Sequence, residues 1–159
     1  MSDQHVDVLV IGAGISGIGA AYHLQVESPN RTYLILEGRS DIGGTWDLFR
    51  YPGIRSDSDM HTLGFSFKPW TADRAIADGP AIMDYLRETI AEHDIERHIR
   101  FGHRVVSAHW SSDEARWTLT VSHDGRPVTI TCGYLFMCSG YYSYRSGYTP
   151  ELPGRERFR

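Results

Sequence analysis

A continuous apolar run near the start of the chain dominates the pattern of apolar and polar residues. Residues 8–11 read Val-Leu-Val-Ile, which is typical of a strand buried on both faces of a sheet. Residues 18–26 favour a helix, and residues 32–36 are again rich in β-forming residues. Parallel strands need a crossover connection, so this order predicts a right-handed βαβ unit with a parallel sheet.

A second helix is expected after Asp78-Gly79. Pro80 favours the first turn of a helix, and apolar residues at 82, 86 and 90 then recur at helical spacing. The stretch between the two helices, residues 40–70, is mostly loop and unusually aromatic. We expect these aromatic side chains to cover either the core or a flat ligand; they are Trp46, Phe49, Tyr51, Phe65, Phe67 and Trp70.

The second half of the chain reads as strands. Residues 99–110, residues 117–122 and a returning strand from Pro127 predict a three-stranded antiparallel meander, with Asp124-Gly125 as a tight turn. A separate apolar strand is expected over residues 134–138. The expected fold class is therefore α/β, a Rossmann-like domain with a parallel sheet and an inserted antiparallel β-meander.

Composition excludes several classes of partner. The chain has 159 residues, a formal net charge of −4 and the apolar and charged fractions of a globular protein, so nucleic acid and anionic membranes are not expected partners. No stretch is long enough to be a transmembrane segment, and no signal peptide is apparent, which predicts a cytoplasmic location. Cys132 and Cys138 would lie roughly 20 Å apart on one extended segment, so both are expected as reduced core residues. The eight histidines show no metal-binding spacing, and no metal site is predicted.

Three glycines follow the first strand with the spacing G-x-G-x-x-G. Gly12 permits a tight turn, Gly14 leaves room for a pyrophosphate, and Gly17 allows close packing of helix on strand. Glu37 ends the second strand, where a dinucleotide-binding fold places a carboxylate that binds ribose hydroxyls. The alternative is an ordinary glycine turn with a surface glutamate.

Longer motifs resemble one enzyme family. The glycine motif, Leu36-Glu37 and Gly43-Gly44-Thr45-Trp46 are together similar to the start of class B flavoprotein monooxygenases, which include flavin-containing and Baeyer–Villiger monooxygenases. The similarity continues through residues 97–101 and 136–142. It implies FAD and NADPH as cofactors. It also implies oxidation of a small ketone, sulfide or thioamide substrate with O₂.

The resemblance also implies site residues. Asp57 would be the residue that takes part in the chemistry, as a polar partner of the nicotinamide beside the flavin; the alternative is an aspartate that caps a loop. The residues expected to bind the cofactors are Gly12, Gly14, Ser16, Gly17, Glu37, Gly44, Thr45, Trp46, Asp47, Leu48, Arg55, Ser56, Asp57, Val105 and Gly140.

Members of that family are much longer, so the resemblance implies an N-terminal fragment. Residues 1–140 would form the first part of an FAD-binding domain, and residues 141–159 a linker toward an NADP-binding domain. Such a fragment should be inactive alone and could self-associate through an exposed sheet edge. Three alternatives stay open: an NAD-dependent dehydrogenase, a non-catalytic module that binds FAD or a partner, and an unfolded remnant.

Overall fold

The computed structural model describes residues 4–158, which fold around one mixed β-sheet. The strands are β1 (Gln4–Ile11), β2 (Tyr33–Leu36), β3 (Ile99–Arg100), β4 (His103–Ser111), β5 (Arg116–His123) and β6 (Arg126–Met137). The helices are α1 (Ile15–Glu27), α2 (Thr45–Leu48), α3 (Met60–Leu63) and α4 (Gly79–Glu92), with short 3₁₀ turns η1 (Glu96–His98) and η2 (Arg155–Arg157). Within the described residues the sheet order is β3-β2-β1-β6-β5-β4. The expected α/β fold, Rossmann-like with an inserted antiparallel meander, is confirmed.

Strand β1 lies at the centre of the core. It pairs in parallel with both β2 and β6, and Val8 and Val10 pack on the helix side while Leu9 and Ile11 pack on the opposite side. All four side chains are at most 8% exposed. The prediction of a strand buried on both faces is therefore confirmed, and so is the parallel βαβ unit.

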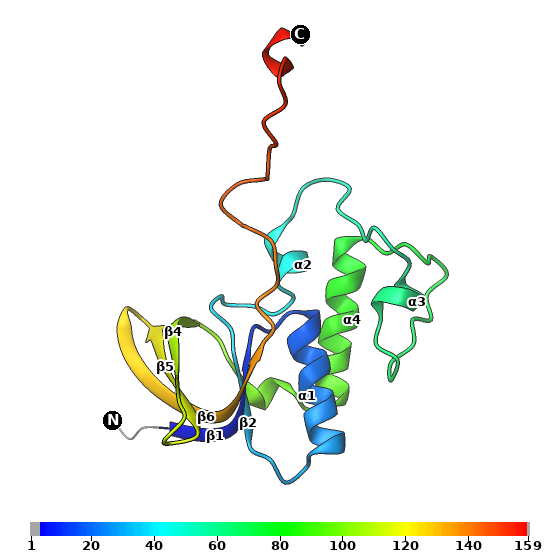
Figure 1. Cartoon of the computed structure of the whole chain (residues 1–159). Helices are drawn as coiled ribbons and strands as arrows, with labels where there is room; N and C mark the ends of the chain where they lie inside the picture. The colour runs from blue at the N-terminus through cyan, green and yellow to red at the C-terminus, as the bar shows by residue number, and fades with distance from the viewer. Residues whose placement is uncertain (1–3, 159) are drawn as a thin grey trace.

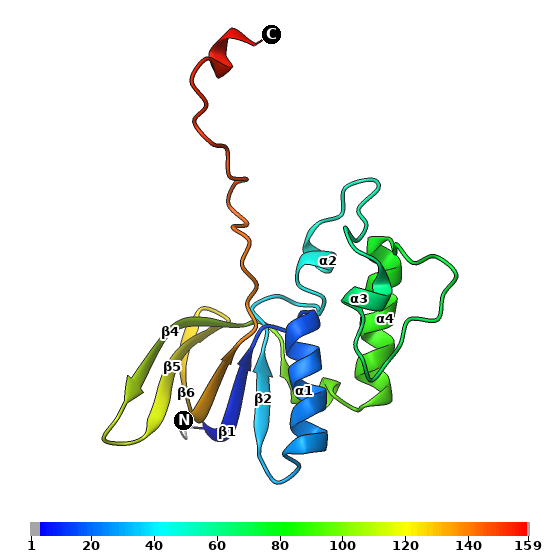
Figure 2. The ribbon, with the colours of Figure 1, turned by 45° about the vertical axis from the view of Figure 1, so that its right-hand side comes forward.

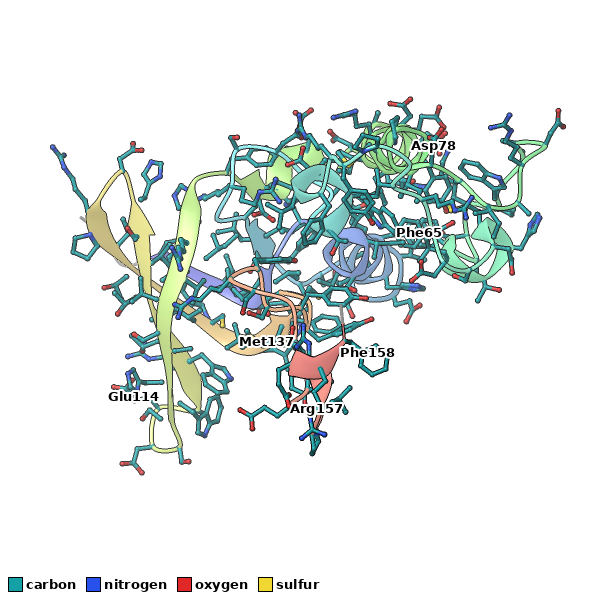
Figure 3. All side chains as sticks on the ribbon, turned by 90° about the horizontal axis from the view of Figure 1, so that it is seen from above. Phe65, Asp78, Glu114, Met137, Arg157 and Phe158 are labelled. Carbon is teal, nitrogen blue, oxygen red and sulfur yellow. The ribbon has the colours of Figure 1, made fainter. Side chains whose placement is uncertain are left out.

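Helices α1 and α4 pack side by side on one face of the sheet (Figures 1 and 2). Helix α4 begins where the sequence predicts, because the Asp78 carboxylate accepts a hydrogen bond from the Ala81 N–H at 2.9 Å and caps the helix. Its predicted stripe is buried: Ile82 and Leu86 are completely covered, and Ile90 is 6% exposed. Seen from above, Asp78 and Phe65 lie on this helical side, and Glu114 lies at the far end of the β4–β5 hairpin (Figure 3).

The meander forms, but two strand predictions are wrong. The single strand expected over residues 99–110 is two strands: β3 pairs with β2, and β4 pairs with β5. The chain turns between them at Gly102, whose φ of +66° interrupts an extended strand. The separate strand expected over residues 134–138 is instead the end of β6. Residues 126–132 of β6 pair antiparallel with β5, and residues 130–137 pair in parallel with β1. The predicted tight turn is confirmed, since Asp124 and Gly125 have φ of 50° and 73°.

The chain after Met137 leaves the sheet and runs away from the body of the molecule (Figures 1 and 2). Tyr148 is 92% exposed and Phe158, at the far end of this tail, is 90% exposed (Figure 3). The assignment of residues 1–140 to an FAD-binding domain and of residues 141–159 to a linker stays a prediction. Residues 1–3 and 159 lie outside the described part of the chain.

Candidate functional site

A cavity of about 550 Å³ lies at the carboxyl ends of β1, β2 and β6. In open parallel sheets this edge is where ligands bind. The lining residues come from five separate segments and the tail, namely from within residues 11–16, 36–39, 43–46, 103–105 and 138–140, with Tyr144. The fold therefore brings Gly12, Gly14, Ser16, Glu37, Gly44, Thr45, Trp46, Val105 and Gly140 together, as the sequence analysis expects of one site.

The glycine loop connects β1 to α1 at this cavity. Gly12 has a φ of +106°, and a Cβ there would lie 2.6 Å from the carbonyl oxygen of Cys138. A Cβ on Gly17 would lie 1.9 Å from the carbonyl oxygen of Gly12, so Gly17 lies in the packed contact of helix and loop and does not line the cavity. At Gly14 the nearest atom to an added Cβ, the Gly44 Cα, would be 3.8 Å away, so a methyl group makes an ordinary contact there without a clash. Gly12 and Gly17 are thus needed for packing, whereas Gly14 lines the cavity, where a bulkier side chain would take room from a ligand.

Glu37 connects the end of β2 to the glycine loop. Its Oε2 accepts a hydrogen bond from the Ala13 N–H and its Oε1 accepts one from the Arg39 N–H, each at 2.9 Å. The residue is only 8% exposed, yet it lines the cavity. Each carboxylate oxygen has two lone pairs, so each can accept a further hydrogen bond from a ligand hydroxyl. Glu37 can therefore shape the loop and bind a diol at once.

The segment 43–48 forms the other side of the cavity. The Gly43 N–H donates to the Ala13 carbonyl at 2.9 Å, which ties this segment to the glycine loop, and Trp46 lines the cavity. Within this segment, two predicted binding residues do not line the cavity. Asp47 is 6% exposed and forms ion pairs with Arg39 and Arg50, and Leu48 lies outside the lining at 36% exposed.

The structure does not bring residues 55–57 to this cavity. Arg55 lines a second cavity of about 750 Å³, bounded largely by the loop before α4. Ser56 is buried, and its N–H donates to the Ala77 carbonyl at 2.9 Å. Asp57 is exposed on the loop that follows α2. Their predicted roles toward the nicotinamide stay predictions.

The start of the tail interacts with the segment that follows α2. The pKa of the Tyr142 phenol is raised, first by its hydrogen bond with the Tyr141 hydroxyl and further by the negative charge of Asp57. Phe49 also meets Tyr144 edge to face at 6.0 Å between ring centroids. The tail therefore contacts the chain just after α2, and Tyr144 of the tail lines the cavity.

A protein-family model for an NAD(P)-binding Rossmann-like domain matches residues 10–89. The chain belongs to this family. The matched stretch begins inside β1 and ends inside α4, so it contains the glycine loop, Glu37 and α2. The cavity of this Rossmann-like domain is thus built mainly from the segments that define the family.

Longer relatives identify the subgroup to which the Rossmann-like domain is similar. FAD-containing monooxygenase EthA of Mycolicibacterium smegmatis is 58% identical over 155 residues, which cover 98% of this chain and 32% of the relative. An oxidized steroid monooxygenase bound to NADP is 32% identical with a TM-score of 0.81, covering 98% of this chain and 29% of that one. Cyclohexanone monooxygenase from Rhodococcus sp. Phi1, bound to NADP⁺, is 32% identical with a TM-score of 0.80, covering 99% and 29%. The chain thus spans about a third of the length of the curated relatives it matches, and the predicted resemblance to flavoprotein monooxygenases is confirmed.

The aromatic residues of the loop divide into two groups. Phe67 stacks on Tyr22 of α1 at 3.5 Å between centroids, and Phe65 stacks on Tyr85 of α4 at 5.8 Å. Trp70 also packs against the helix-side core. Of the loop aromatics, Trp46 lines the cavity, while Phe49 and Tyr51 are exposed. The half-buried aromatic residues Phe65, Phe67 and Trp70 therefore pack on the helical side of the molecule.

Several residues that line the cavity are not among the site residues predicted from the sequence. His103 stacks on His123 at 4.0 Å, and Arg104 packs its stem over Gly38. For Arg39, the one indication in the sequence is its position two residues after Glu37, at the start of a turn. Cys138 lines the cavity as a thiol, and burial raises the pKa of that thiol, which disfavours a nucleophilic thiolate at neutral pH.

No helix between residues 4 and 158 is long and apolar enough to cross a membrane. Over the same range, no three His, Cys, Asp or Glu residues lie together in a way that could hold a metal ion.

Proposed function

We propose that this chain is the FAD-binding part of a flavin-dependent monooxygenase that uses NADPH. The observation that supports it most is that one cavity joins the glycine loop, Glu37 and the 43–46 segment. The relatives point the same way, since EthA is an FAD-containing monooxygenase and the similar steroid monooxygenase binds NADP. When bound, FAD supplies the transfer of electrons and the activation of O₂, and the protein supplies binding and orientation.

The residues of the cavity fit FAD. The part of the cavity lined by Gly14, beside the first N–H groups of α1, suits the pyrophosphate, because a helix start favours anions. Glu37 would accept hydrogen bonds from the ribose hydroxyls, and the backbone of Val105 would meet the adenine. Trp46 and Thr45 would lie against the flavin end and limit the access of water there. A volume of about 550 Å³ is within the range of small-molecule sites.

The substrate side of the proposal rests on the relatives. Relatives of known structure include a cyclohexanone-bound cyclohexanone monooxygenase, which supports a small ketone for the whole protein. Sulfide and thioamide substrates, with O₂ as oxidant, belong to the same proposal through the family resemblance of the sequence motifs. Arg55, Ser56 and Asp57 would contact the nicotinamide of NADPH, with Asp57 as its polar partner. A cytoplasmic location stays a prediction of the sequence.

An FAD titration of the purified 159-residue chain tests the binding proposal. We expect saturable binding, and we expect Gly14→Val to weaken it by at least about tenfold, because the side chain would fill the space beside the helix start. Flavin fluorescence and absorbance report the binding. Gly147→Val in the exposed tail is the matched control, since a Cβ there would meet nothing within 4 Å.

The titration has outcomes that overturn the proposal. A folded chain that does not bind FAD but binds NAD tightly would favour the NAD-dependent dehydrogenase.

We also propose that the chain does not catalyse the reaction alone, because it spans 32% of the length of EthA. Steady NADPH-dependent oxygenation of a ketone or a sulfide by the purified chain would refute that part.

We further propose that the chain self-associates through the second half of β6. Tyr134, Phe136 and Met137 are 60%, 41% and 59% exposed. In the part of the chain that the structure describes, β5 pairs with β6 only as far as Cys132, which leaves one edge of the following residues without a strand. A second copy could pair there.

Sedimentation velocity tests self-association over a range of concentrations. We expect a dimer that forms with increasing concentration and that Tyr134→Lys suppresses, because a charge at an edge opposes strand pairing. Tyr148→Lys is the control, since Tyr148 is 92% exposed on the tail. A monomer at every concentration, or equal effects of the two substitutions, would refute pairing at this edge.

A further inference from the structure

Arg39 contacts two sides of the cavity at once. Its backbone N–H donates to Oε1 of Glu37 at 2.9 Å, at the side proposed for the ribose. Its guanidinium reaches the opposite way: Nη1 donates to the Gly44 carbonyl at 3.1 Å, and Nη2 pairs with Oδ2 of Asp47. One residue therefore joins the turn after β2 to the start of α2.

Helix α2 needs such ties. It has four residues, which is too short for a helix to be stable by itself. Its own hydrogen bonds run from the Leu48 N–H to the Gly44 carbonyl at 2.9 Å and from the Phe49 N–H to the Thr45 carbonyl at 3.1 Å. The buried Asp47 carboxylate anchors it through two arginines. The Arg50 side chain is 75% exposed, whereas that of Arg39 is 35% exposed and lines the cavity.

Three turns then form a closed ring of contacts. The Gly43 N–H bonds to the Ala13 carbonyl, the Ala13 N–H bonds to Glu37, and Arg39 links Glu37 to α2. We propose that Arg39 is a positioning residue that holds α2, and with it Trp46, at the flavin end of a cofactor whose ribose is held by Glu37. This inference rests on the proposed FAD-binding function.

Loss of the Arg39 side chain should affect the binding of the two ends of the cofactor differently. Without the guanidinium, Asp47 keeps only the exposed Arg50 as a charged partner, and the Gly44 carbonyl loses a donor. Helix α2 would then loosen, and binding the flavin end would have to order it again. A ligand that ends at the pyrophosphate, such as ADP, reaches the glycine loop and Glu37 but not α2. Arg39 should therefore matter for FAD and little for ADP.

The experiment compares Arg39→Met with Arg50→Met, because both remove a partner of the same carboxylate. Without cofactor, hydrogen exchange of the Leu48 and Phe49 amides is measured by NMR. We expect exchange to become about tenfold faster in Arg39→Met and to change less than about threefold in Arg50→Met. In titrations, Arg39→Met should lower FAD affinity by about tenfold and ADP affinity by less than about threefold.

Two results would overturn the proposal. Unchanged exchange in Arg39→Met would show that Arg39 does not hold α2, whether or not FAD binds. Equal losses of FAD and ADP affinity would show that Arg39 acts on the ADP end or on the fold. If Arg39→Met does not fold, Arg39→Lys decides, because lysine keeps the charge without the two-donor geometry and should show the same pattern at smaller size. A wild-type chain that binds ADP but not FAD would instead refute the proposed function. The hydrogen-exchange data would still test whether Arg39 holds α2.

Discussion

Gly17→Ala is expected to destabilise the chain strongly, because its Cβ would lie 1.9 Å from the carbonyl oxygen of Gly12. No rotamer can relieve a clash that involves Cβ and backbone, so α1 would have to move away from β1. That movement would pull Ile18, which is completely buried, out of the helix-side core. We expect a loss of about 3 kcal/mol or more in the free energy of unfolding, against a typical total of about 5–15 kcal/mol. Urea denaturation followed by far-ultraviolet circular dichroism measures it.

Gly14→Ala is the matched control for this prediction. It adds the same methyl group three residues earlier, where the nearest atom would be 3.8 Å away. We expect its unfolding free energy to stay within about 1 kcal/mol of wild type, the size of a changed helix cap. Equal stabilities of the two variants would show that α1 can shift from the glycine loop at little cost, and would contradict the packing role given to Gly17.

Sequence reasoning works well where a local pattern fixes the structure. The Val8–Ile11 run has one stable solution, a strand with both faces covered, and the glycines that follow it leave few choices for the next turn. Glu37 can be placed because the end of one parallel strand lies beside the end of its neighbour. The start of α4 is also local, since Asp78 caps it through a residue three positions away.

Features that depend on contacts distant in sequence could not be predicted. Residues 126–137 form one strand because β5 pairs with residues 126–132 and β1 with residues 130–137, and neither partner is encoded in the strand itself. The turn at Gly102 did leave a signal, a glycine inside an otherwise extended run. The pairing of Arg39 with Asp47 left none, since arginine and aspartate eight residues apart in a loop usually face water.

Residues 55–57 show the limit of reasoning from resemblance. A motif gives the residue types of a site, but the surrounding chain decides which of them meet. Here Ser56 is held against Ala77, and Arg55 faces a different cavity from Glu37. The roles of Arg55, Ser56 and Asp57 toward NADPH therefore stay predictions.

Glu37→Gln is expected to cost both stability and cofactor affinity, although it changes one atom type. Both carboxylate oxygens accept backbone N–H groups, from Ala13 and from Arg39. Glutamine has only one side-chain oxygen, so its NH₂ group would face one of these backbone N–H groups. One hydrogen bond would be lost, and two donors would point at each other. We expect a loss of about 2–3 kcal/mol in the free energy of unfolding. Affinity for FAD should fall by about a hundredfold, because one acceptor for the ribose hydroxyls is lost and the glycine loop is displaced.

Affinity for ADP should fall by a similar factor in Glu37→Gln, since ADP and FAD share the adenosine ribose. This parallel loss is the opposite of the pattern expected for Arg39→Met, so the two variants separate the ribose end from the flavin end. Glu27→Gln is the control, because Glu27 is 68% exposed and pairs only with His23 on the surface of α1 among the ion pairs of the described chain. If Glu37→Gln binds both ligands as the wild type does, Glu37 supports the loop alone, and the diol must be held by other groups in the cavity.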